Sequence, residues 1–116
     1  MSEVRLPAPV AATLVPDVDD RADLPGAFGY YVHAATGDSV MRGLIYVCPC
    51  GCGVLHALPF HPLTADDKRH GRAGWRFDGH RERPTLSPSI LSHEGGTKDG
   101  PTHWHGYLRK GFWTQA

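Results

Sequence analysis

The chain has 116 residues, of which 41% are hydrophobic and 21% charged, a globular balance with room for one domain. Lys plus Arg and Asp plus Glu each total 12, and a net charge of zero argues against a chain built mainly to bind nucleic acid. No apolar run approaches the ~18 residues of a membrane span, and the first seven residues do not resemble a secretory signal. We therefore expect a cytoplasmic protein without a membrane partner.

Residues 1–25 are predicted to form an extended N-terminal arm, because this segment is rich in Pro and Ala and then acidic. Three of its apolar residues, Val10, Leu14 and Val15, are expected to lie against the domain or against a partner. The folded domain is predicted to occupy residues 26–116.

The rest of the chain is predicted to be mainly β, built from small antiparallel hairpins. Aromatic and β-branched residues favour strands, and the 14 glycines and 10 prolines favour many turns. The expected strands and extended segments, in chain order, are residues 29–33, 43–47, 54–58, 75–77, 85–91, 103–108 and 112–114. The clearest helix signal is one turn at residues 64–69, capped by Thr64.

Three cysteines, Cys48, Cys50 and Cys52, lie within five residues at the tip of a predicted hairpin. An odd, closely spaced set in a reducing compartment suits a metal better than disulfides. Thiolates are preferred zinc ligands, and Gly51 and Gly53 let the backbone turn tightly around an ion. We predict that the domain is organised around one structural zinc ion (Zn2+). The alternative is a pair of these cysteines joined by two histidines.

The fourth zinc ligand is expected to be a histidine, because the chain has only three cysteines. His103 and His105 are two apart on a predicted strand and therefore face the same side. His56 follows the cysteines on the exit strand. We favour His103, since a distant ligand closes a long loop and stabilises a small core more than a local one does. His105 and His56 remain alternatives.

The segment Ser87-Pro88-Ser89 fixes two hydroxyl groups on one side of an extended stretch. A fixed serine becomes a nucleophile when a base lies within hydrogen-bond distance, and His105 is available. Gly95 and Gly96 supply amides for an oxyanion. The acids that are candidates to orient the imidazole are Asp78, Glu82 and Asp99. The competing interpretation is that this segment forms a turn or a sheet edge and has no catalytic role.

Three segments in combination resemble a known family: residues 48–53 (CPCGCG), Trp75 followed by residues 84–90 (PTLSPSI), and residues 105–111 (HGYLRKG) ending in Trp113. It is a family of small bacterial and phage domains, long catalogued as of unknown function. Some members are encoded beside bacterial ubiquitin-like conjugation genes and are proposed to be peptidases. The resemblance covers roughly residues 43–113.

The resemblance implies a serine role for Ser89 and a base role for His105, with Cys48, Cys50 and Cys52 as the cysteine cluster. It also implies a protein substrate, namely a ubiquitin-like protein or its conjugates, and a place in phage defence. Relatives often carry a further cysteine shortly before the histidine. This chain has Pro-Thr-His at residues 101–103 instead, which either moves the ligand role to His103 or leaves the site with a weaker ligand set.

The working hypothesis is a zinc-stabilised serine hydrolase, a peptidase that processes or removes a bacterial ubiquitin-like modifier. A zinc-dependent interaction module without chemistry is the first alternative, and it requires Ser89 and His105 to lie apart. A metallohydrolase is the second, in which His103 and His105 both bind a zinc that keeps an open water position. A knuckle that binds nucleic acid is the third.

Overall fold

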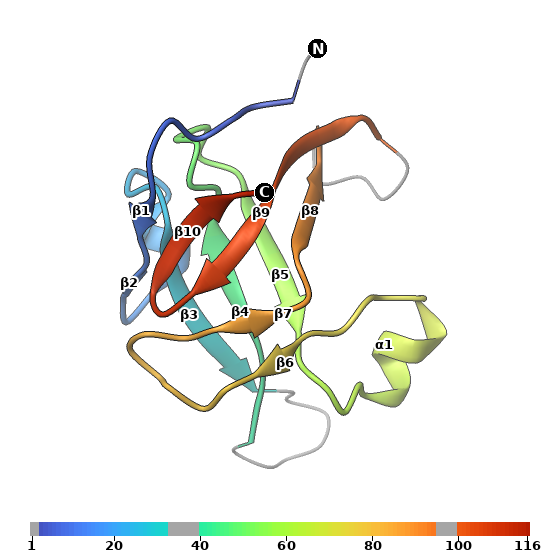
Figure 1. Cartoon of the computed structure of the whole chain (residues 1–116). Helices are drawn as coiled ribbons and strands as arrows, with labels where there is room; N and C mark the ends of the chain where they lie inside the picture. The colour runs from blue at the N-terminus through green and yellow to red at the C-terminus, as the bar shows by residue number, and fades with distance from the viewer. Residues whose placement is uncertain (1–2, 33–39, 95–99) are drawn as a thin grey trace.

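Two four-stranded sheets pack face to face in the computed structural model, which describes residues 3–32, 40–94 and 100–116 (Figure 1). One sheet has the order β1-β10-β9-β8, with bounds Val10–Ala11, Phe112–Gln115, Thr102–Arg109 and Ile90–His93. The other has the order β2-β3-β4-β5, with bounds Thr13–Leu14, Ala27–Val32, Met41–Val47 and Leu55–Pro59. The pair β6 (Arg76–Phe77) and β7 (Leu86–Ser87) forms a third, small sheet.

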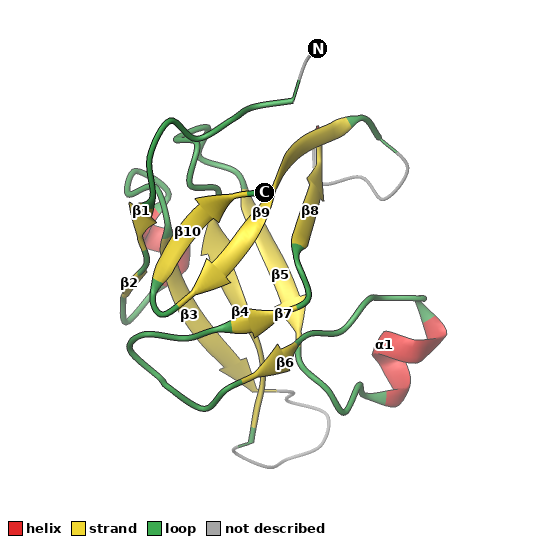
Figure 2. Ribbon diagram, viewed as in Figure 1, coloured by secondary structure: helices red, strands yellow, loops and turns green. Residues whose placement is uncertain are grey.

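The prediction of a mainly β domain with antiparallel sheets is confirmed (Figure 2). The extended segment 85–91 is divided into β7 and β8 at Pro88, which has no N–H for a ladder bond. The predicted helical turn is α1 (Ala65–Arg69), where Thr64 and Asp67 form a capping box. Of the predicted strand at 29–33, His33 lies outside the described residues.

Part of the segment 1–25 adds strands to both sheets. Strand β1 pairs antiparallel with β10, and β2 pairs parallel with β3. A 3-10 turn, η1 (Val18–Arg21), follows and is capped by the Asp17 side chain. Val15 and Val18 are buried in a small apolar cluster with Ala27 and Val47. The domain boundary near residue 25 remains a prediction.

The main core lies between the sheets. Most of its members come from β3, β4 and β5 on one side and from β8, β9 and β10 on the other, and Leu86 of β7 and Phe60 join them. Trp104 and Trp113 are completely buried. Their indoles meet edge to face, with centroids 6.1 Å apart. A side chain at Gly106 would collide with the Trp104 ring and the Thr114 carbonyl, so glycine permits this packing.

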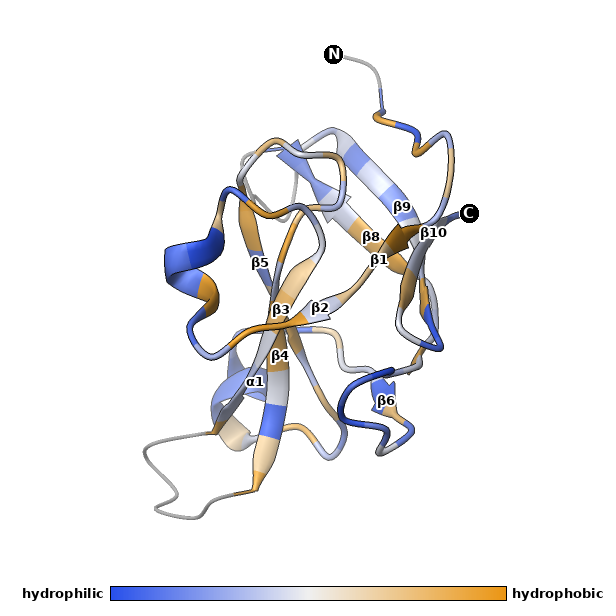
Figure 3. Cartoon of the chain, turned by 90° about the vertical axis from the view of Figure 1, so that its left-hand side faces the viewer, coloured by the Kyte–Doolittle hydropathy of each residue, from blue (hydrophilic) through white to orange (hydrophobic). Residues whose placement is uncertain are grey.

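Strand β9 carries the residues that matter for the site. Trp104, Gly106 and Leu108 point into the core, and the alternation of a strand therefore places His103 and His105 together on the opposite face. Outside the strands, the loop beside β6, residues 78–83, is exposed and strongly hydrophilic (Figure 3). In the described part of the chain, every helical segment is too short and too polar to cross a bilayer.

Candidate functional site

The hairpin between β4 and β5 presents the three cysteines. The Cys48 N–H donates to the Val54 carbonyl at 2.9 Å, which closes the turn at its base. Gly51 and Gly53 have φ values of 91° and 82°, a region that L side chains rarely adopt, so glycine is needed at both positions. The turn brings the Sγ atoms of Cys48 and Cys50 to 3.2 Å from each other.

His103 completes this cluster from the other sheet. Its Nε2 lies 3.2 Å from the Sγ of Cys50 and 3.5 Å from the Sγ of Cys52. The four ligand atoms of Cys48, Cys50, Cys52 and His103 all lie within 4.8 Å of one another. The group is therefore a candidate metal centre that joins the β4–β5 hairpin to β9.

The other two candidate histidines lie elsewhere. His56 stacks on Tyr46 with ring centroids 5.3 Å apart, and its Nε2 is buried without a hydrogen-bond partner among the described residues. The Nε2 of His105 lies at hydrogen-bond distance from a serine instead. Of the three histidines, the structure thus brings His103 to the sulfur atoms.

The chemistry of the donor set fits a soft divalent metal. Burial raises the pKa of the Cys48 thiol and of the Cys50 thiol, so the protein alone disfavours thiolates there. A divalent cation would reverse this, because it stabilises coordinated thiolates and offsets their mutual repulsion. Three sulfurs and one imidazole are a recurrent ligand set of closed tetrahedral sites.

Ser89 and His105 meet on the same sheet as His103. The Oγ of Ser89 lies 3.1 Å from the Nε2 of His105, within hydrogen-bond range. Ser89 immediately precedes β8, and Leu91 pairs with His105 across the β8–β9 ladder. The buried side chain of Ile90, which is 1% exposed, anchors the chain directly after the serine.

Trp75 holds the serine backbone from the segment between α1 and β6. Its backbone pairs with the end of β5: its N–H donates to the Pro59 carbonyl, and its carbonyl accepts from the N–H of His61, both at 2.9 Å. Its indole Nε1–H then donates to the Ser89 carbonyl at 3.2 Å. No local sequence signal identifies this contact, because the two residues are 14 positions apart and meet only through the tertiary fold.

The predicted acids do not join the pair. Among the described residues, no carboxylate is hydrogen-bonded to the His105 side chain. Asp78 instead accepts from the backbone N–H groups of His80 and Thr85. Asp99 and the predicted oxyanion residues Gly95 and Gly96 lie outside the described residues. Among the described residues, the arrangement is a serine–histidine pair.

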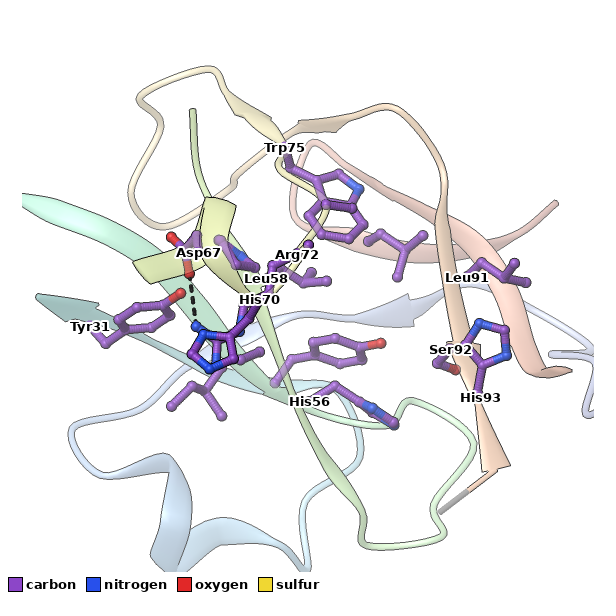
Figure 4. Close-up of a pocket in the computed structure, with 17 residues that line it drawn as sticks. Tyr31, His56, Leu58, Asp67, His70, Arg72, Trp75, Leu91, Ser92 and His93 are labelled. Atoms are coloured by element: carbon purple, nitrogen blue, oxygen red, sulfur yellow. Dashed lines mark hydrogen bonds and ion pairs between the residues drawn. The ribbon is translucent and has the colours of Figure 1, made fainter. Parts of the chain in front are cut away.

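A pocket of about 820 Å³ lies between β5 and β8 (Figure 4). Its lining includes Ile90, the residue that follows Ser89, but neither Ser89 nor His105. Apolar side chains from β5, from β8 and from the segment before β6 form part of its wall, among them Leu58, Ile90 and Trp75. Near α1, the Arg72 guanidinium lies 3.1 Å from the Asp67 carboxylate. Sequence reasoning did not anticipate this pocket, since it is formed by strands that diverge in space.

The fold and these residues define a small β domain with a Cys3His cluster next to a serine–histidine pair. Residues 15–116 match the sequence model of the bacterial ubiquitination-like system serine protease family (BubE), and the chain belongs to this family. The resemblance noted in the sequence is thereby confirmed. No curated protein and no solved structure matches the chain.

Proposed function

We propose that this chain is a serine hydrolase in which Ser89 is the nucleophile and His105 the general base. The observation that supports this most directly is the 3.1 Å distance between the Ser89 Oγ and the His105 Nε2. The serine is half-buried, is anchored on both sides and remains open to an incoming carbonyl.

The reaction requires one proton to travel through His105. Its Nε2 accepts the hydroxyl proton while the Oγ attacks the carbonyl carbon and forms a tetrahedral intermediate. Collapse of that intermediate breaks the bond to the leaving amine, which takes the proton from the imidazolium. Water then repeats the sequence on the acyl-enzyme, and the serine hydroxyl is restored.

Cys48, Cys50, Cys52 and His103 would hold a structural zinc ion, which supplies a cross-link and no chemical step. With four protein ligands the coordination sphere is closed, which disfavours a catalytic zinc and the metallohydrolase alternative. His105 lies two residues from His103 on β9, so a ligand bond to His103 holds the base in place. Reduced thiols of this kind suit the cytoplasm.

The family name implies a protein substrate, and we infer that the substrate is a ubiquitin-like modifier or its conjugates. The bond that is cut would lie directly after the carboxyl end of the modifier. Processing of a precursor and removal of the modifier from a conjugate would therefore transfer the same acyl group to the serine. The pocket between β5 and β8 supports this assignment, since its lining begins at Ile90, the residue after Ser89, and a peptide side chain can enter it.

The test is covalent labelling with a fluorophosphonate, which reacts with an activated serine. The wild-type protein should be labelled once, at Ser89, and Ser89→Ala should lose labelling and cleavage while keeping its circular dichroism spectrum. Ser87→Ala is the matched control, because this exposed serine lies two residues away in β7 and should keep both activities. Labelling that persists in Ser89→Ala would reject the assignment, and a wild type that is never labelled would favour an interaction module.

A further inference from the structure

The outer edge of β8 is open directly beside Ser89. Strand β8 pairs with β9 on one side, and no strand among the described residues pairs with its other side. Strand β5, across the pocket, is likewise the last strand of its sheet. Open edges of this kind accept an added strand through backbone hydrogen bonds.

The hydrogen-bonding pattern shows which backbone groups face the pocket. The His105 carbonyl accepts from Ala116 on the β10 side at 3.1 Å, so alternation turns the polar groups of Gly106 toward β8. Gly106 pairs with Ile90, which leaves the N–H and C=O of the next residue, Leu91, on the outer edge. That edge ends at Ser89, whose carbonyl already accepts a hydrogen bond from the indole of Trp75.

Chain direction identifies which part of a substrate fits. Strand β8 runs away from Ser89, so a strand added antiparallel to it runs toward Ser89 and delivers its carboxyl side there. That is the acyl side of a scissile bond. A parallel strand would run the other way and place the leaving group along β8. Antiparallel pairing is the more stable arrangement per residue and is the one β8 already makes with β9.

We propose that the free edge of β8 binds the acyl side of the substrate, an extended peptide tail, as an added antiparallel strand that ends at Ser89. One tail residue exchanges two backbone hydrogen bonds with Leu91. Its two neighbours in the tail point into the apolar pocket, because side chains alternate along a strand. The preferred tail therefore carries an apolar residue at these positions. This inference rests on the proposed role of Ser89.

The test uses a library of tetrapeptides whose carboxyl end carries aminomethylcoumarin, so that every contact of the peptide is on the acyl side. Leu91→Pro removes the outward N–H, whereas the ladder bonds to β9 come from neighbouring residues. Leu91→Ala removes the side chain and keeps the N–H. We expect the ratio of peptide cleavage to fluorophosphonate labelling to be about tenfold lower in Leu91→Pro than in Leu91→Ala. Equal ratios would overturn the proposal.

Phe112→Ala is the matched control, because Phe112 is as exposed as Leu91, at 48% against 47%, and lies on β10. It should leave cleavage and labelling unchanged. If Leu91→Pro does not fold, methylation of single backbone nitrogens in the best peptide decides the question with wild-type protein. One methylated position should abolish cleavage and the adjacent ones should not, and uniform tolerance would overturn the proposal.

The outcomes also separate this proposal from the function on which it rests. A wild type that is labelled at Ser89 but cleaves no tetrapeptide would overturn acyl-side binding at β8 and leave the serine hydrolase intact. A wild type that is never labelled would overturn both.

Discussion

Replacing His103 by alanine is expected to remove the connection between β9 and the cysteine hairpin. His103 and Cys52 are 51 positions apart in the sequence. A cross-link that closes a loop of this length lowers the entropy of the unfolded chain by about 14 cal/mol/K, which corresponds to about 4 kcal/mol at 25 °C. The unfolding entropy of a chain of this size is roughly 240 cal/mol/K, so the melting temperature should fall by about 17 °C.

The assay is thermal unfolding by circular dichroism, with metal content measured on the same samples. His103→Cys is the matched control, since four thiolates also form a closed zinc site and should preserve both metal and melting temperature. His56→Ala tests the rival ligand and should keep one bound metal. A His103→Ala protein that melts with the wild type and holds one equivalent of metal would refute this reasoning.

Two further predictions concern the pocket wall and the serine. Burial opposes the ionisation of Asp67, yet hydrogen bonds from Thr64 and Arg72 outweigh it and hold its pKa below the ordinary 3.8. Its stabilising effect is therefore present above pH 3.8 and lost at lower pH, so urea titrations should find Asp67→Asn less stable than wild type at pH 7 and equal to it in acid. Trp75→Phe keeps a ring but removes the donor to the Ser89 carbonyl, and steady-state kinetics should show kcat about fivefold lower with KM little changed. A change in KM alone would mean that Trp75 only lines the pocket.

The parts of the site that depend on short-range spacing could be predicted from the sequence. Cysteines at alternate positions with glycines between them can converge only where the backbone turns tightly, as it does at Gly51 and Gly53. His103 and His105 share a face of β9 because a strand alternates, so one strand serves two sites. The choice of His103 over His56 followed from loop closure, and the structure places His103 at the sulfurs.

The parts that could not be predicted depend on how the two sheets meet. The bond from Trp75 to Ser89 exists only because β5 and β8 flank the same pocket. Strands β1 and β2 have two residues each, too few for a periodic pattern, and their partners β10 and β3 stabilise them. Asp78 has the chemistry to orient a histidine, but its carboxylate closes its own turn by accepting from His80 and Thr85.

The most direct measurement is the rate at which Ser89 reacts with a fluorophosphonate before and after the metal is removed, read by mass spectrometry of the labelled peptide. Chelation should abolish the labelling of Ser89, and added zinc should restore it, because the Cys3His cluster holds the strand that carries His105. Undiminished labelling in metal-free protein would contradict this account.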